Sequence, residues 1–346
     1  MFLLRFILIR CLAAIPVLFV ISVVTFAIIQ APEGDYGDYI RSMLMNQGGT
    51  SAEVAEAQAQ IYRERHGLND PLVFQYLNWM WGIVTRFDFG QSLYFNKPVA
   101  DVVSERLPRT IALALITHLF ASVIGIAMGI IAASRQYSWI DSLFGAIAFL
   151  GMTVPRFLLA LVIIYILAFR LNVQEFGSFY SSRYGGQPYW FGLFDFNWAK
   201  LWNLIQHVWP VIFIASLGGL AYNMRVMRAN LLDVLNAQYI ETARAKGMSR
   251  TGVLMKHAVP NALHPLVAHQ GVVLPYMLTG EIEVAIVFGL PTVGPAITGA
   301  MAVGDTYVTA TFVMVLAAAL VIGNILADLL LIALDPRVRQ ELGARA

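Results

Sequence analysis

Long apolar runs that contain almost no charge limit the folds open to this chain. Residues 11–29 are apolar apart from Ser22 and Thr25. At a rise of about 1.5 Å per residue, a helix of this length nearly crosses a hydrocarbon core of roughly 30 Å. Because Arg5 and Arg10 precede the run, a signal peptide is the alternative, but its apolar region is normally about 7–15 residues long. The run predicts a retained transmembrane anchor helix within residues 1–30.

Five further apolar runs predict membrane spans. They cover residues 111–133, 143–168, 208–222, 266–288 and 308–334, which makes six spans with the first. Charged residues form 13% of the chain, whereas a soluble domain carries about 25%. We therefore expect an all-α integral membrane protein with six transmembrane helices, a long structured outer loop at 31–109 and a core membrane domain at 110–346.

The distribution of Lys and Arg predicts the orientation of the chain in the membrane. Six of these residues lie between positions 223 and 264, and others lie near both ends of the chain. Loops on the cytoplasmic side carry an excess of Lys and Arg, so both termini and the 223–264 loop are expected there. The single cysteine, Cys11, excludes an intramolecular disulfide.

The outer loop is too long for a simple connector, and its sequence predicts local structure. Thr50 and Glu53 have the spacing of a capping box, in which two side chains satisfy amide groups at a helix start. The predicted helix runs to His66, and Gly67 ends it.

A second outer loop, before the fourth span, is rich in aromatic residues. Trp198, Trp202 and Trp209 have helical or near-helical spacing, which is typical of a short helix lying in the membrane interface. Stacking platforms for a sugar or a peptide would need the same side chains, so both interpretations stay open.

The 223–264 loop is a polar, helix-forming stretch between two apolar runs. Ala243 favours a helix, Gly247 suits a C-terminal cap, and Ser249 can cap a second helix. Pro260 lacks an amide proton and should stop or kink that second helix before the next span. The stretch predicts two short helices joined by a glycine turn, acting either as a docking knob or as a solvated connector.

The motifs in this stretch resemble those of a known family. Glu241-Thr-Ala243, Gly247 and Pro260 match the spacing of the EAA loop of ABC importer permeases, and the run from Tyr239 to Leu263 is similar to their peptide/nickel branch. An ordered set of further matches lies along the chain: Arg10 to Pro16, Gly67-Leu-Asn-Asp-Pro-Leu, Asp88-Phe-Gly-Gln-Ser92, Glu105-Arg-Leu-Pro-Arg-Thr110 and Leu334-Asp-Pro-Arg-Val-Arg339.

Four features depart from the pattern of that branch. Thr242 stands at the second position of the EAA motif, where alanine is usual, and Val259 precedes the proline. Arg156 follows Pro155 where a small polar residue is common. The segment that starts at Ala31 replaces the more usual Pro-Gly-Asp-Pro. The last two departures lie outside the expected motor contact, so they bear on substrate rather than on transporter class.

The resemblance implies one permease half of a binding-protein-dependent ABC importer in the bacterial inner membrane. Its partners would be a homologous second permease, two ATP-binding cassette ATPase subunits on the 223–264 coupling loop, and an extracytoplasmic solute-binding protein. ATP and Mg²⁺ would bind to the ATPases, and this chain would hold no cofactor or metal and contact no nucleic acid. The residues expected to couple to the ATPases are Glu241, Thr242, Ala243, Arg244, Ala245, Lys246, Gly247, His257, Pro260 and Asn261.

Oligopeptides are the cargo that we expect, with oligosaccharides and nickel as alternatives. Nickel ligation by His257, His264 and His269 is disfavoured, because an offset of five residues is out of phase on a helix. A different class, an ion-coupled secondary transporter, would use an intramembrane carboxylate such as Asp328. A membrane enzyme ranks last, since the sequence contains no recognisable catalytic motif.

Charged residues in or beside the spans are candidates for the translocation pathway. Arg156 either snorkels to the interface or lines the pore, where it would attract an anionic group. Glu281 and Glu283 are two residues apart and point to different sides of a helix, which argues against a paired acid/base site. One of the two is expected to face the outer gate.

Overall fold

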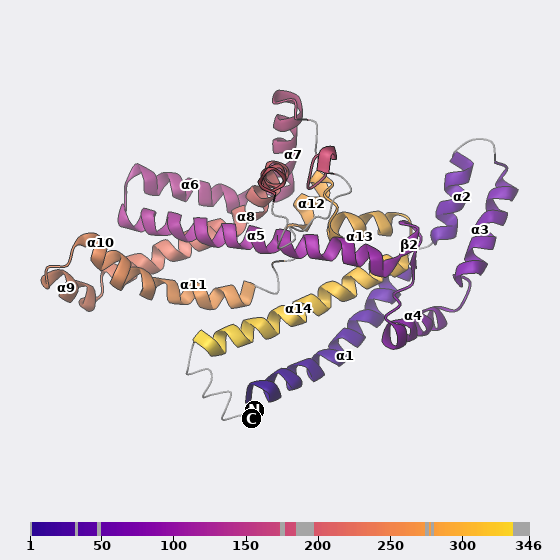
Figure 1. The fold of residues 1–346 in the computed structure, drawn as a ribbon, viewed down its shortest axis with the longest axis horizontal. Coiled ribbons are helices and arrows are strands. Elements are labelled where there is room, and N and C mark those ends of the chain that lie inside the picture. The colour runs from indigo at the N-terminus through magenta and orange to yellow at the C-terminus, as the bar shows by residue number, and fades with distance from the viewer. Residues whose placement is uncertain are drawn as a thin grey trace. The chain divides into compact units, whose positions relative to one another are not determined.

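The computed structural model describes residues 2–31, 34–46, 50–173, 177–184, 197–273, 277 and 280–334. These residues are almost entirely helical (Figure 1), and the sheet that they contain is one antiparallel pair, β1 (Gln91–Ser92) with β2 (Lys97–Pro98). The prediction of an all-α membrane protein is confirmed. Part of the segment that follows Ala31, and the closing motif beyond Leu334, lie outside the described residues.

The chain packs as two compact units. Unit 1 comprises residues 1–110 and 292–325, and unit 2 comprises residues 111–291 with the last part of the final helix. The predicted regions, divided at residues 30 and 109, follow expected membrane boundaries and stay a prediction. The two packed units are defined differently, because each joins segments that are far apart in sequence.

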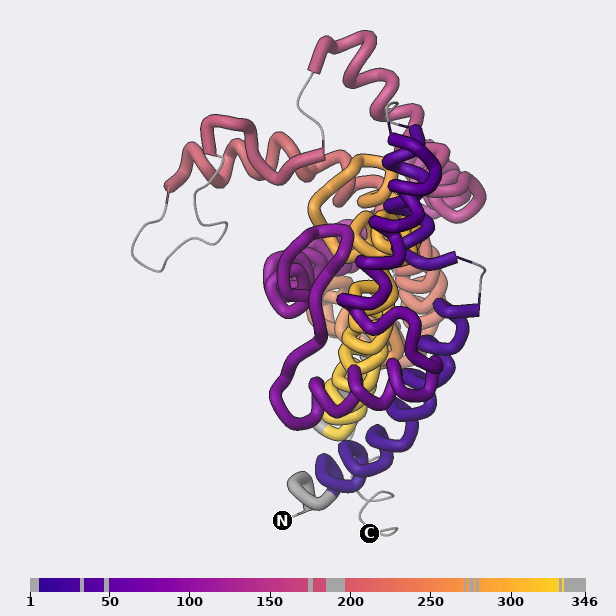
Figure 2. The backbone as a smooth tube through the Cα atoms, turned by 90° about the vertical axis from the view of Figure 1, so that its right-hand side faces the viewer, coloured from indigo at the N-terminus to yellow at the C-terminus, as the bar shows by residue number. Residues whose placement is uncertain are grey.

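Unit 1 contains the helices of the first long loop and the two terminal helices. Its elements are α1 (Phe2–Gln30), α2 (Tyr36–Asn46), α3 (Ala52–His66), α4 (Leu72–Arg86), the start of α5 (Val99–Ser134), α13 (Val293–Ala302) and most of α14 (Thr306–Leu334). Figure 2 shows α1 in indigo and α14 in yellow, each as a single uninterrupted helix.

Unit 2 contains the broken helices and the charged loop. Its elements are the rest of α5, α6 (Trp139–Thr153), α7 (Arg156–Tyr165) with a π-helical turn (Ile166–Arg170), a 3₁₀ turn (Ser182–Tyr184), α8 (Trp198–Leu235), α9 (Gln238–Ala245), α10 (Arg250–Val253) with a π-helical turn (Leu254–Ala258), α11 (Val259–Val273) and α12 (Ile282–Phe288).

Four helices among the described residues are long and apolar enough to cross a membrane: Phe6–Gln30, Val99–Ser134, Trp198–Leu235 and Thr306–Leu329. Two bent helix pairs raise this number to six if each pair forms one span. The predicted spans at 11–29, 111–133 and 308–334 therefore lie within continuous helices. The predicted count of six depends on the two bent pairs.

The third predicted span, 143–168, is wrong as a single straight helix. The chain breaks between α6 and α7, whose axes differ by 104°, and Figure 1 shows α7 turning away from the line of α6. Val154 has an extended backbone and Pro155 precedes α7. A proline disfavours helical geometry in the residue before it, which explains the position of the break.

The fourth and fifth predicted spans also differ from the structure. The expected span at 208–222 and the expected interfacial helix at Trp198 are parts of one helix of 38 residues, α8, which continues through Pro210. The expected span at 266–288 is not continuous, because α11 ends at Val273 and α12 begins at Ile282. Helix α13 was not predicted, since its run of ten residues is too short for a span.

The predicted capping box of α3 is wrong by one residue. The N-cap is Ser51, whose hydroxyl accepts a hydrogen bond from the Val54 amide at 3.4 Å. The other end is confirmed: α3 runs to His66, and Gly67 adopts a left-handed conformation with φ of 67°. Thr50 and Ser51 are both good caps in isolation, so the pattern alone did not separate them.

Small residues bring α5 and α8 close together in unit 2. A Cβ atom added at Gly125 would lie 2.6 Å from the Leu220 carbonyl oxygen, and one at Gly129 would lie 2.7 Å from that of Met224. The spacing of four residues places both glycines on one face of α5, as in the GxxxG pattern of membrane helices. This contact provides a rigid helix pair on which the charged loop is built.

Candidate functional site

The charged loop folds into a compact knob, which we define as residues 238–258. Helix α9 ends at Ala245, and Gly247 follows with φ of 79°. The Met248 amide donates to the Ala243 carbonyl and the Gly247 amide to that of Arg244, which is a Schellman arrangement. The prediction of a glycine turn between two short helices is confirmed.

The second helix of the knob begins as predicted but does not end at Pro260. The Ser249 hydroxyl accepts a hydrogen bond from the Gly252 amide at 3.2 Å, so Ser249 is the N-cap of α10. A π-helical turn then leads directly into α11, which continues through Pro260 and Pro265. The predicted stop is therefore wrong, whereas the other predicted outcome, a distortion of the helix at this point, agrees with the π turn directly before Pro260.

An apolar seat holds the knob on unit 2. Ile240 is fully buried, and Ala243 is buried beside it. Both belong to a cluster with Met227 and Leu231 of α8 and with Val253 of α10. Burial of such side chains contributes roughly 25 cal/mol per Å² of apolar surface, so the seat fixes the orientation of α9.

The opposite face of α9 presents charge. Glu241, Arg244 and Lys246 are exposed and form no hydrogen bond or ion pair through their side chains within the described part of the chain. The Thr242 hydroxyl donates to the Gln238 carbonyl oxygen, and Ala245 and Gly247 are also exposed. The alternation of buried and exposed positions therefore separates a seat from a charged outer face.

The remaining coupling candidates lie where the second helix leaves the knob. His257 is half-buried, whereas Pro260 and Asn261 are exposed. The Asn261 amide nitrogen donates to the His257 carbonyl oxygen at 2.7 Å, which ties the π turn to α11. Beside the knob lies a groove of about 470 Å³ whose lining includes Arg244 and Arg250.

The structure brings all three candidates for the translocation pathway to one cavity of unit 2. Arg156, Glu281 and Glu283 line a space of about 500 Å³, together with Thr117 of α5. Glu281 is buried and Glu283 is exposed, although both line this cavity. His118 and Ser216 also line the cavity and were not identified from the sequence.

The histidines considered as nickel ligands do not form a metal site. Among the described residues, no group of three His, Cys, Asp or Glu side chains is placed to hold a metal ion. His269 instead stacks on the Tyr222 ring, with 4.3 Å between ring centroids.

Sequence reasoning missed two polar contacts, one within each unit. In unit 2, the Arg228 guanidinium donates two hydrogen bonds to the Asp141 carboxylate at 2.6 and 2.8 Å and joins α8 to α6. In unit 1, the buried Asp305 carboxylate accepts from the Ser92 hydroxyl and from the Leu93 amide, both at 2.9 Å. Opposite charges in neighbouring apolar runs were the available signal for the first contact.

Comparison with known proteins identifies the family. Residues 125–340 match the family described as binding-protein-dependent transport system inner membrane component, and residues 3–114 match the N-terminal part of such membrane components.

Two relatives cover nearly the whole chain. The oligopeptide transport system permease protein AppB of Bacillus subtilis is 32% identical over 95% of this chain and 97% of its own length. A Brucella abortus protein named "Putative peptide transport system permease protein" is also 32% identical, over 96% of this chain and 98% of its own length. The chain therefore belongs to the family of inner membrane components of binding-protein-dependent transport systems.

Proposed function

We propose that this chain is one permease half of an ATP-driven importer that moves oligopeptides delivered by a solute-binding protein. The family supports the transport role, and the relatives named as peptide permeases over nearly their full length support the cargo. The oligosaccharide and nickel alternatives of the peptide/nickel branch have no such support from these names.

The division of α9 into an apolar seat and a charged face is the observation that carries the motor-contact proposal. A buried seat offers a path for force, because Ile240 and Ala243 pack in one cluster with Met227 and Leu231 of α8. The outer charges of Glu241, Arg244 and Lys246 remain available to a partner. Two ATPase subunits, which would bind ATP and Mg²⁺, would dock on this knob and on that of a homologous second permease.

In this proposal the knob and both chain termini lie on the cytoplasmic side, as the distribution of Lys and Arg suggests. Closure of the ATPase dimer would move α9 and, through its seat, the helix pair of α5 and α8. Such a switch needs different contacts in at least two states, which the paired ATPases supply. The cavity lined by Arg156, Glu281 and Glu283 would then lie on the path of the cargo.

The experiment tests coupling in vesicles that contain the complete importer. We expect Gly247→Asp, or the charge reversal Glu241→Lys, to leave membrane insertion intact while ATP hydrolysis no longer drives uptake. The matched control is Glu53→Lys, which reverses an exposed charge on α3. Normal coupled uptake in a variant that carries both knob changes would sink the docking proposal, and uptake driven by an ion gradient without ATP would favour a secondary transporter.

A further inference from the structure

Arg156 lines the cavity of unit 2 and also contacts the backbone of its wall. Its Nη1 atom donates a hydrogen bond to the Gly280 carbonyl oxygen at 2.8 Å. A Cβ atom added at Gly218 of α8 would lie 2.8 Å from the Nη2 atom of Arg156, so the guanidinium packs directly against this glycine. The guanidinium therefore bridges α7, α8 and the segment that precedes α12, and it positions the residue that follows Gly280.

That residue, Glu281, has a carboxylate without a partner. Only 1% of Glu281 is exposed, and neither carboxylate oxygen has a hydrogen bond among the described residues. The charge of Arg156 acts on this carboxylate from within the same cavity, but the guanidinium donates to the neighbouring carbonyl and not to Glu281. A buried carboxylate that accepts no hydrogen bond is costly, so the Glu281 oxygens can still take a donor from a bound molecule.

A second unpaired acceptor lines the same cavity. The Thr117 hydroxyl oxygen of α5 is buried and also has no hydrogen-bond partner in the described part of the chain. A carboxylate and a hydroxyl together suit a small donor-rich cation. A divalent metal would need more anionic or neutral oxygen ligands, and the described residues offer no group of three acidic, His or Cys side chains.

We propose that Glu281 and Thr117 bind the α-ammonium group of a peptide in transit. The ammonium has three donors and a positive charge, and every unmodified peptide carries one whatever its sequence. Charge-assisted contact with Glu281 offsets the cost of moving this group through an apolar pathway. This inference rests on the proposed function, because it assumes that peptides are the cargo.

The experiment compares a peptide with its N-acetyl form, which lacks the ammonium. The complete importer is reconstituted in vesicles, and the pair is chosen so that purified binding protein loads both forms to equal occupancy. The peptide contains no Lys or Arg. We expect wild type to import the free-amine form at least about tenfold faster, and Glu281→Gln to bring this ratio close to one.

Three further variants make the result specific. Thr117→Val should lower the ratio in the same direction by a smaller factor. Glu281→Asp, which keeps the charge, should retain a preference for the free amine and so shows that loss of folding does not explain the Gln result. Glu53→Gln removes an exposed carboxylate of α3 that is not among the lining residues of the cavity, and it should behave as wild type.

Two outcomes separate this inference from the proposed function. A Glu281→Gln importer with the wild-type ratio would overturn the ammonium site while leaving peptide import in place. Failure of the wild-type complex to import either peptide, although it hydrolyses ATP, would overturn the peptide cargo itself.

Discussion

Two helical elements outside the long apolar helices use their charges in opposite ways. The hairpin of α2 and α3 in unit 1 pairs its charges internally, and the knob of unit 2 presents them outward. The contacts that hold the two elements also differ: ion pairs in the hairpin and apolar packing in the knob. The comparison indicates which of the two surfaces is built to meet a partner.

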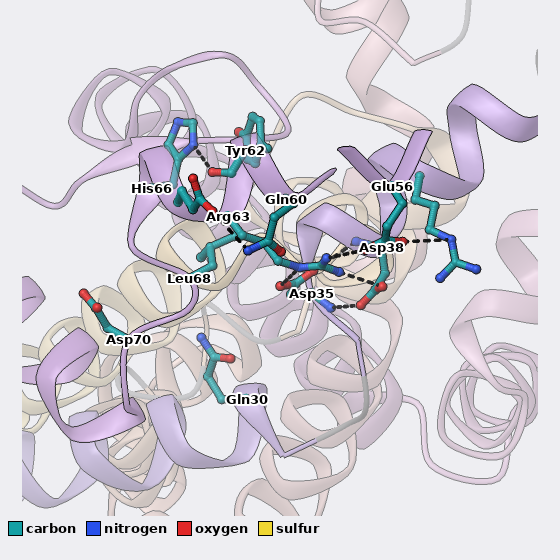
Figure 3. A network of polar contacts seen from close by, with 12 residues as sticks. Gln30, Asp35, Asp38, Glu56, Gln60, Tyr62, Arg63, His66, Leu68 and Asp70 are labelled. Atoms are coloured by element: carbon teal, nitrogen blue, oxygen red, sulfur yellow. Dashed lines mark hydrogen bonds and ion pairs between the residues drawn. The ribbon is translucent and has the colours of Figure 1, made fainter. Parts of the chain in front are cut away.

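In the hairpin, one arginine holds three carboxylates (Figure 3). Arg63 donates to Asp35 and Asp38 at 2.8 Å and to Glu56 at 3.2 Å, and only 14% of its side chain is exposed. Ala55 is fully buried on the same helix, so the two helices approach closely. The hairpin is therefore stabilised by a network that satisfies its own charges.

In the knob, burial of apolar side chains attaches α9 to α8 and α10, and the charged side chains of α9 take no part in this attachment. Ile240 is held by residues of α8 and α10, while Glu241 and Arg244 remain without side-chain partners in the part of the chain that the structure describes. Ionic pairing could not serve both purposes, because a charge used for attachment is no longer available for docking. Four predictions test this contrast.

The largest effect is expected from a charge in the apolar seat. Ile240→Asp buries a carboxylate without a partner and should destabilise the knob by about 3 kcal/mol or more. Hydrogen exchange of the α9 amides should rise, and the proposed ATPase partners should no longer co-purify. Tyr239→Asp is the control, because Tyr239 is 46% exposed. Equal protection in the two variants would contradict the apolar seat.

The matching test in the hairpin removes the charge of Arg63, which contacts all three carboxylates of the network. Arg63→Met keeps most of the volume but leaves three neighbouring carboxylates, and we expect a loss of about 2 kcal/mol. Limited proteolysis between residues 36 and 66 should become faster. Arg65→Met changes an exposed arginine of the same helix and should have little effect. Unchanged proteolysis in Arg63→Met would show that apolar contacts hold the hairpin as they hold the knob.

A smaller effect is expected at the turn of the knob. Gly247 has a positive φ, but a Cβ there would meet nothing within 4 Å, so only the backbone opposes a side chain. Gly247→Val should cost about 1–2 kcal/mol, and Gly247→Asn clearly less, because Asn tolerates the left-handed region. Thermal unfolding of the purified complex would rank them. If Gly247→Asn were less stable than Gly247→Val, the left-handed backbone conformation would not be the cause of the cost.

The smallest effect concerns pH and belongs to the hairpin alone. Burial acts to raise the pKa of the Asp35 carboxyl, but the hydrogen bond and charge of Arg63 outweigh it and hold that pKa below the ordinary value of 3.8. The ionised carboxylate therefore stabilises the hairpin above pH 3.8, and this contribution is lost as the pH falls through the lowered pKa.

Acid titration monitored by hydrogen exchange of α2 and α3 would measure this loss. Arg63→Met should remove the pH dependence in this range, and the protection of α9 should not follow the same curve. A parallel loss in both elements would indicate general acid unfolding.

Local features were predicted well because their causes lie within a few residues. Gly67 and Gly247 end helices through their own backbone freedom, and Ser249 caps the helix that follows it. Long apolar runs likewise located α1, α5 and α14. Pro155 was a usable signal for the break between α6 and α7, but the apolar run on both sides concealed it.

Features that join distant segments were not available from the sequence. Asp141 and Arg228 are 87 residues apart, and Asp305 meets Ser92 across 213 residues. Arg156 was expected either at the interface or in the pore, and its actual hydrogen bond to Gly280 spans 124 residues. No period or motif predicts such pairs, since they depend on how the helices pack.

The sequence by itself determined that the chain is a helical membrane protein with a two-helix charged knob, because apolar length, caps and glycine turns act locally. The tertiary structure alone decided which carboxylates are used internally and which are left unpaired. Glu281 and Glu283 have the same chemistry and are two residues apart, yet one is buried and the other exposed. Their difference arises from desolvation by packed helices, and desolvation is a property of the assembled fold.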